Sequence, residues 1–168
     1  MKFINKIRGD SAALPPCPAF KVIALAFAGA FLAIATLTVL SHSLDIMIIL
    51  GSFGASCMIV FGYPDVPFSQ PRNIVFGHLI GTCIGLIFIQ TFGAQWWSVA
   101  LAVAVAMALM MLTRTVHPPA GSNPVIVFLL QPDWSYIVFP TLTGALLLVL
   151  VALLFHNITR NSRWPKYW

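Results

Sequence analysis

The residues in this sequence best suited to bind a ligand lie at two interruptions of otherwise apolar runs. The first interruption, Ser52–Ser56, contains two serines and one glycine, and the second, His117–Pro124, is rich in proline. Backbone groups that proline or glycine frees within an apolar span must be covered by protein or face a watery cavity. A broken helix also directs its N-terminal N–H groups and positive dipole end towards anions. The pattern therefore favours an anion site, with a packing kink as the alternative.

Backbone N–H groups and two histidines are the first candidate ligands. The candidate backbone positions are Gly54, Ala55 and Ser56 in the first interruption and Gly121, Ser122 and Asn123 in the second. His117 stands at the second interruption, where it could donate a hydrogen bond, and His78 lies deep in an apolar run. For either histidine the alternative is a neutral ring bonded to a neighbouring backbone group.

Two arginines are the second kind of candidate. Arg72 and Arg114 are the basic residues that lie between the basic ends of the chain, and each is close to a proline-containing break. Their charge would attract an anion to the mouth of a pathway. The alternative is an interface anchor, because an arginine near the edge of a bilayer can extend cheaply to the polar headgroups.

Other chemistries are not indicated. The sequence contains no nucleophile elbow, no phosphate-binding Gly-Lys-Ser/Thr motif and no paired carboxylates, and its histidines lack metal-ligand spacing. Cys17, Cys57 and Cys83 are scattered, and two of them lie in apolar runs, which is typical of small buried side chains. We therefore expect no enzymatic activity, no cofactor and no bound metal.

The composition places these candidates in a membrane. The 168 residues are 60% hydrophobic and only 8% charged, and the mean hydropathy is +0.94. Soluble domains are about a quarter charged, so the chain is predicted to be an all-α integral membrane protein with one domain. The net charge of +5 comes from the flanks of the apolar region, which argues against a nucleic-acid surface.

Six apolar segments are predicted to be helical, four of them long spans and two short or broken. Their ranges are Val22–Leu40, Ile46–Tyr63, Ile74–Phe92, Trp96–Thr113, Ala120–Leu130 and Ile137–Phe155. A full helical crossing needs about 20 residues, so the fifth segment is short. The predicted organisation is a cytoplasmic N-terminal segment (1–21), a transmembrane domain (22–157) and a cytoplasmic basic tail (158–168).

The distribution of basic residues predicts the orientation. If all six segments cross, every Lys and Arg lies on one side, with Asp45 and Asp133 opposite. If the second and fifth segments are re-entrant instead, Arg72 and Arg114 move to the other side. Both topologies place both termini in the cytoplasm, and we favour six crossings in a bacterial inner (plasma) membrane.

The two halves of the sequence resemble one another. Three features of the first half, Gly54, Ile59-Val60-Phe61 and Gly77, recur at one constant offset as Gly121, Ile126-Val127-Phe128 and Gly144. Three segments in each half would make the second copy inverted, an architecture common among transporters. Sparse matches in Gly- and Val-rich helices also arise by chance, which is the alternative.

A glycine face marks the third segment. Gly77, Gly81 and Gly85 repeat at four-residue spacing and lie on one side of a helix, where they let another backbone approach closely in lipid. The partner would be a helix of the same chain or of a second copy. A homo-oligomer is expected, because a chain of this size encloses a pathway poorly.

Several of these motifs, taken in order, resemble the HPP family of integral membrane proteins. They are Ser52-Phe53-Gly54-Ala55-Ser56, Gln70-Pro71-Arg72-Asn73, Gly77-His78, and Arg114 with His117-Pro118-Pro119-Ala120-Gly121. The resemblance covers residues 20–157. Such proteins are commonly described with four spans, and plant and cyanobacterial members are similar to nitrite transporters. In the usual pattern Ala-Gly-Ala follows the Pro pair, whereas this sequence reads Ala120-Gly121-Ser122-Asn123-Pro124, which leaves the substrate open.

The resemblance implies a small-anion transporter, and with the features above it predicts a transporter or channel for a small monovalent anion such as nitrite. Arg72 and Arg114 would supply attraction, and the two interruptions would meet around a polar cavity and bind the ion. The expected partners are the lipid bilayer, a small inorganic anion and further copies of the chain, and no nucleic acid. The alternative is a non-transporting membrane scaffold or sensor, in which the interruptions are only kinks.

Overall fold

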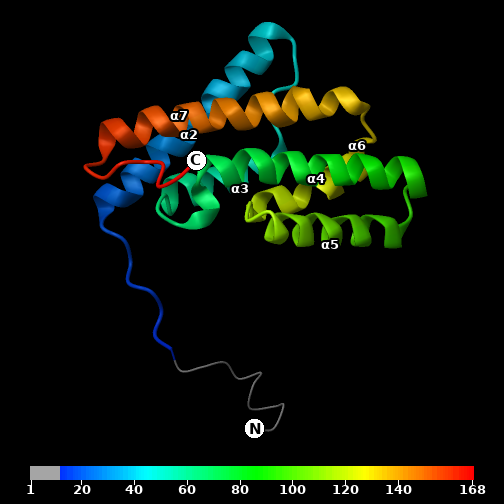
Figure 1. Cartoon of the computed structure of the whole chain (residues 1–168). Helices are drawn as coiled ribbons and strands as arrows, with labels where there is room; N and C mark the ends of the chain where they lie inside the picture. Colours follow the sequence, from blue (N-terminus) through cyan, green and yellow to red (C-terminus); the bar gives the residue numbers. More distant parts are fainter. Residues whose placement is uncertain (1–11) are drawn as a thin grey trace, which may run out of the picture.

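The computed structural model describes residues 12–168, and within that range it is helical and contains no strand (Figure 1). The α-helices are α2 (Phe20–Leu44), α3 (Gly51–Gly62), α4 (Pro71–Phe92), α5 (Trp96–Leu112), α6 (Asn123–Leu130) and α7 (Thr143–Thr159). Short helical turns are η1 (Pro67–Ser69), η2 (Pro118–Ser122), η3 (Trp134–Ile137) and η4 (Val138–Leu142). The predicted all-α membrane fold is confirmed.

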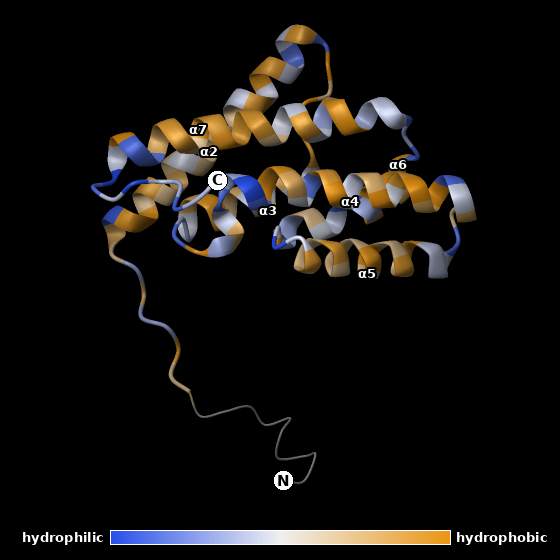
Figure 2. Ribbon diagram, in the orientation of Figure 1, coloured by the Kyte–Doolittle hydropathy of each residue, from blue (hydrophilic) through white to orange (hydrophobic). Residues whose placement is uncertain are grey.

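Three helical stretches are long and apolar enough to cross a membrane: Phe20–Leu44, Pro71–Phe92 and Trp134–Thr159. The ribbon is mainly hydrophobic along its helices, and hydrophilic residues gather at the connections (Figure 2). Large apolar side chains such as Phe27 and Leu129 point outward. An apolar exterior over the helices is what contact with lipid chains requires.

The second segment is only partly helical, which corrects the predicted position of its break. Ser52–Ser56 lies inside α3, and the irregular backbone is residues 46–50 instead. The Ile48 N–H donates to Ser41 Oγ at 2.8 Å, and Gly144 on α7 leaves space for the Ile48 carbonyl. These tertiary contacts replace the helical hydrogen bonds and hold the chain extended.

This combination of extended chain and helix has the length of a crossing. The 12 residues of α3 rise about 18 Å, well short of the roughly 30 Å hydrocarbon core. The extended residues before α3 add about 3.3 Å each, which brings the whole segment close to that thickness. The segment containing η2 and α6 is built similarly, because an extended stretch at 115–117 precedes its helical turns.

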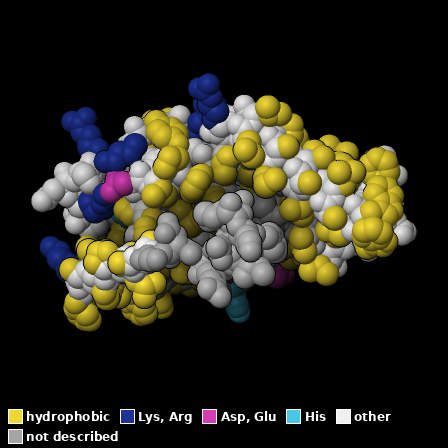
Figure 3. All heavy atoms as spheres, turned by 90° about the horizontal axis from the view of Figure 1, so that it is seen from below, with side chains coloured by type: hydrophobic (Ala, Val, Ile, Leu, Met, Phe, Trp, Pro, Cys, Tyr) yellow, Lys and Arg dark blue, Asp and Glu magenta, His cyan; other side chains and the backbone are white. Residues whose placement is uncertain are grey.

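Basic side chains gather at one end of the bundle, which we call the basic end. Its described members are Lys21, Arg72, Arg114, Arg160, Arg163 and Lys166. Val22 at the start of α2 lines one cavity with Thr159 at the end of α7. Arg72 Nη2, at the start of α4, donates to the Thr113 carbonyl at the end of α5 at 3.1 Å. Four helix ends therefore lie at this end of the bundle. The Lys and Arg side chains visible in Figure 3 lie in one half of the face, whereas hydrophobic side chains are spread over both halves. Lys2, Lys6 and Arg8, which the sequence predicts on the same side of the membrane, lie outside the described residues.

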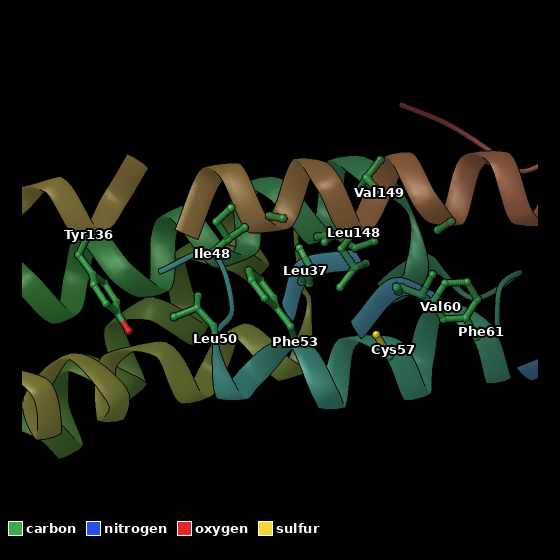
Figure 4. Packing of buried hydrophobic residues seen from close by; sticks show 14 of the residues in the cluster. Leu37, Ile48, Leu50, Phe53, Cys57, Val60, Phe61, Tyr136, Leu148 and Val149 are labelled. Atoms are coloured by element: carbon green, nitrogen blue, oxygen red, sulfur yellow. The ribbon is translucent and has the colours of Figure 1, made fainter. Parts of the chain in front are cut away.

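The main hydrophobic core lies between α2, α3 and α7. Leu37, Ile48, Phe53 and Leu148 are each at most 2% exposed and lie side by side in the close-up view (Figure 4). Ile48 belongs to this core because the extended chain brings it inward. The core therefore fixes the position of α3 and of the side chains on its opposite face.

The glycine face of α4 contacts the second interrupted segment of the same chain, as the sequence predicted for a close helix contact. A Cβ added to Gly77 would lie 2.8 Å from His117 Cβ, and one added to Gly85 would lie 2.9 Å from Pro124 Cα. At Gly81 the added atom would meet the Ala120 carbonyl oxygen. These contacts are tighter than side chains allow, so the glycines bring the 117–124 backbone against α4.

Candidate functional site

The two interrupted segments meet in the interior at one hydroxyl group. Ser56 Oγ on α3 lies 2.8 Å from His117 Nε2, just before η2, and 3.0 Å from His78 Nε2 on α4. The two imidazole rings face one another edge to face, with centroids 5.1 Å apart. Three different segments thus contribute to a single buried contact.

The direction of each hydrogen bond follows from one backbone carbonyl. His117 Nδ1 lies 2.7 Å from the Phe68 oxygen, which can only accept, so Nδ1 carries the proton. The Nε2 atom of a neutral His117 is then an acceptor, and Ser56 must donate to it. Since a hydroxyl has one proton, the Ser56 oxygen accepts from His78 Nε2–H.

The chain of bonds continues through an amide to two threonines. His78 Nδ1 is left as an acceptor, and Asn123 Nδ2 lies 3.1 Å from it. The same amide nitrogen donates to Thr82 Oγ1 at 3.0 Å, and Thr82 contacts Thr141 Oγ1 at 3.1 Å. We call this set the central chain; its members are Ser56, His78, Thr82, His117, Asn123 and Thr141.

The central chain is buried and uncharged. Each member is at most 2% exposed, and the Phe53 ring packs edge-on against His78 with centroids 4.9 Å apart. Hydrogen bonds in such a low-dielectric interior are strong, and an unpaired group there is costly. The arrangement therefore stabilises one packing of α3, α4 and the η2–α6 segment.

The remaining candidate positions lie away from the central chain. Gly54, Ala55 and Ser122 are exposed, and the Ser122 hydroxyl bonds only the nearby Pro119 carbonyl at 2.8 Å. Gly121 is half-buried, with open space where its Cβ would be. The structure thus brings together Ser56, His78, His117 and Asn123 and leaves the other backbone positions on the surface.

Arg72 and Arg114 are exposed at the basic end. Arg72 donates to the Thr113 carbonyl. The next residue in the chain, Arg114, has the left-handed backbone conformation, with a φ of 57°. Both arginines lie beside the α4–α5 helix ends, as a mouth would require, but neither contacts the central chain in the described residues.

The predicted polar cavity is wrong in one respect, because the polar groups bond to one another rather than line an open space. The cavity that touches His117 measures about 290 Å³ and is otherwise lined by Met107, Met110, Val116, Pro118 and Gly121. A larger groove of about 480 Å³ runs along α3 and η2 and is also mainly apolar. In this conformation the site is closed.

Sequence reasoning missed Thr82, Thr141 and the Phe68 carbonyl. Thr82 stands one helical turn after His78, and that four-residue spacing is the signal that could have identified it. Thr141 and Phe68 lie in other segments and carry no comparable local signal.

The C-terminal residues 160–168 form a strap across the loop before α4. Trp164 is 1% exposed, and its indole N–H donates to the Pro64 carbonyl at 3.1 Å. The Lys166 N–H donates to Gln70 Oε1 at 2.7 Å. The predicted basic tail is therefore folded onto the bundle in this structure.

The strap is linked to the segment that carries His117. The Tyr167 hydroxyl lies 3.1 Å from Asn73 Oδ1, and Asn73 Nδ2 donates to the Val116 carbonyl at 2.9 Å. Asp65 forms ion pairs with Arg160 and Lys166. Partial burial raises the pKa of Asp65, but the hydrogen bonds and charges of Lys166 and Arg160 outweigh it, so the pKa lies below its usual range.

Asp65→Asn is expected to loosen the strap, because it removes both ion pairs. Exposed ion pairs are worth at most about 1 kcal/mol each, so loss of the two should raise amide exchange in residues 160–166 by up to roughly thirtyfold. The parent should loosen likewise as the pH falls through the folded-state pKa of Asp65, because a depressed carboxyl pKa stabilises only while ionised. Hydrogen–deuterium exchange measures this, with Asp133→Asn as the control at the opposite end. Equal exchange in both variants would show that Asp65 does not hold the strap.

Comparison with known proteins identifies the family. The family model described as "HPP, transmembrane region" matches residues 15–165, nearly the whole chain. The chain belongs to the HPP transmembrane family. Within this family model's range lie all members of the central chain and most of the strap.

Two curated relatives are described as transmembrane proteins of Dictyostelium discoideum. One is 34% identical over 166 residues, covering 92% of this chain and 58% of the relative. The other is 33% identical over 150 residues, covering 82% of this chain and 48% of the relative. The chain thus spans about half the length of the curated relatives it matches. No solved structure matches it significantly.

Proposed function

We propose that this HPP protein is a transporter or channel for a small monovalent anion, and that nitrite is the substrate to test first. The observation that carries the proposal is the meeting of two interrupted crossings at Ser56 and His117, with a 2.8 Å contact in the bundle interior. Interrupted helices that meet near mid-membrane are typical of transporter binding sites. The family resemblance supplies nitrite as the first candidate.

Packing around two glycines supports an inverted repeat. A Cβ at Gly77 would lie 3.2 Å from the Thr115 oxygen and 3.5 Å from Ala120 Cβ. A Cβ at Gly144 would meet the Ile48 oxygen and the Phe53 ring. Gly77 and Gly144 are separated by the offset that relates the two halves of the sequence. The same offset separates Ile48 from Thr115 and Phe53 from Ala120. Each half therefore receives the other half's interrupted segment at an equivalent glycine.

The basic end is proposed to face the cytoplasm of a bacterial cell. Its six described basic residues lie at the opposite end of the bundle from the carboxylates Asp45 and Asp133, which follow the far helix ends. The positive-inside rule requires such an excess of Lys and Arg on the cytoplasmic side. In this orientation both termini are cytoplasmic, and Arg72 and Arg114 lie on the inner side. Assembly into a homo-oligomer remains part of the proposal.

Arg114→Gln is expected to lower anion flux by about tenfold while folded yield stays near that of the parent, because a charge at a mouth raises the local anion concentration. Arg114→Lys should recover part of the flux if charge matters more than bidentate geometry. Arg163→Gln, the same charge change in the exposed strap, is the control. Anion uptake into proteoliposomes provides the measurement, and parent-like uptake in both Arg114 variants would make this residue an interface anchor.

A membrane scaffold or sensor without transport is the second candidate. The observation that favours it is the closed central chain, whose polar groups are bonded to one another in an interior without a polar cavity among the described residues. Uptake by purified protein across a panel of nitrite, nitrate, formate and chloride separates the two candidates. Protein-dependent uptake of one or more anions supports transport. Absence of uptake for every anion in the panel supports the scaffold or sensor.

A further inference from the structure

We infer that the Ser56–His117 contact is a proton-binding site and that the anion crosses together with a proton. The inference rests on the proposed transport function and adds the coupling ion to it. It is carried by the hydrogen-bond geometry around Ser56, which accommodates two protonation states without a movement of heavy atoms.

In the neutral state the protons of the two bonds between Ser56 and the histidines have fixed positions. The Phe68 carbonyl fixes the His117 proton on Nδ1, Ser56 donates to His117 Nε2, and His78 Nε2–H donates to Ser56. The single Ser56 proton is fully used in this arrangement. The Ser52 carbonyl, 3.2 Å from Ser56 Oγ, is then left without that proton.

An additional proton can enter at His117 Nε2. The new N–H would donate to the Ser56 oxygen, which has two lone pairs and still accepts from His78. The Ser56 hydroxyl would rotate to the Ser52 carbonyl, which lies within hydrogen-bond distance. All groups remain bonded, because the Ser52 carbonyl has a second lone pair beside the one that accepts the helical N–H.

Charge balance connects this proton to the anion. The groups that face His117 are Ser56 on α3, His78 on α4 and the Phe68 carbonyl, and none of them carries a charge in the neutral state. Arg72 and Arg114 are exposed at the basic end. A lone anion or a lone proton in this interior would cost several kcal/mol, whereas the two together are neutral. The proton leaves water on one side, binds Nε2, and returns to water on the other side with the anion.

The test uses the full chain in proteoliposomes that contain a pH-sensitive dye, with nitrite as the probe and protein-free vesicles as the leak control. An inward nitrite gradient should acidify the lumen by one proton for each nitrite. Entry should not respond to a potential imposed with valinomycin and potassium. His117→Gln should lose the proton movement, whereas His156→Gln, a buried histidine that bonds the Val60 carbonyl, should retain it.

The outcomes separate the coupling from the function. Nitrite entry that is accelerated by an inside-positive potential and leaves the luminal pH unchanged would overturn proton coupling and keep transport. Absence of protein-dependent entry for every anion tested would overturn both. The potential dependence of the parent decides the question even if His117→Gln fails to fold.

Discussion

Gly81→Leu is expected to abolish recovery of folded protein. An added Cβ would meet the Ala120 carbonyl oxygen and lie 3.1 Å from Asn123 Cβ, and the rest of the leucine side chain has no space between α4 and η2. Overpacking a close contact costs roughly 1–3 kcal/mol, and more where the backbone must move. Here the displaced backbone also carries Asn123, so the central chain should break at the same time.

The measurement is the yield of monodisperse protein in detergent together with the thermal unfolding midpoint. Gly54→Leu is the matched control, because an added Cβ at this exposed position meets nothing within 4 Å. A parent-like midpoint for Gly81→Leu would show that the glycine face does not determine the packing of α4.

Ser56→Ala is expected to lower the free energy of unfolding strongly without creating a large cavity. The change leaves the His78 Nε2–H without an acceptor and His117 Nε2 without a donor, in an interior closed to water. Each orphaned buried group costs roughly 1–3 kcal/mol, so the total is large against the stability of a small protein.

Ser122→Ala is the control for Ser56→Ala, because it removes a hydroxyl that is exposed and bonds only locally. Thermal unfolding in one detergent compares the two. Equal midpoints would mean that the histidines find other partners and that Ser56 does not organise the central chain.

The fold was predictable where composition and length decide it. Apolar runs such as Val22–Leu40 and Ile74–Phe92 are long enough to indicate spans, and the observed helices begin and end within a few residues of them. The irregular stretch at 46–50 was not predictable, because its cause is tertiary. Ser41, seven residues earlier, supplies the hydrogen bond, and Gly144, distant in sequence, supplies the space that holds Ile48 extended.

The candidate site was predictable only in part. His78 and His117 were selected as polar side chains in or beside apolar runs, and Ser56 and Asn123 as backbone N–H positions at the two interruptions. The structure brings these four residues together through their side chains, which bond to one another. The predicted polar cavity failed for the same reason, since side chains that satisfy each other leave no space for water. Thr141 could not be found from local spacing because its partner Thr82 lies on another segment.

The concentration dependence of nitrite uptake into proteoliposomes tests the central claim most directly. It compares the parent, Ser56→Ala and Ser122→Ala at equal amounts of folded protein, below the unfolding temperature of each. We expect saturable uptake by the parent and Ser122→Ala, and a rate at least about tenfold lower for Ser56→Ala, since loss of roughly 1.4 kcal/mol of binding is a tenfold effect. Equal saturable uptake by all three would contradict a site at the meeting of the two interrupted crossings, and uptake no faster than in protein-free vesicles would contradict transport of nitrite itself.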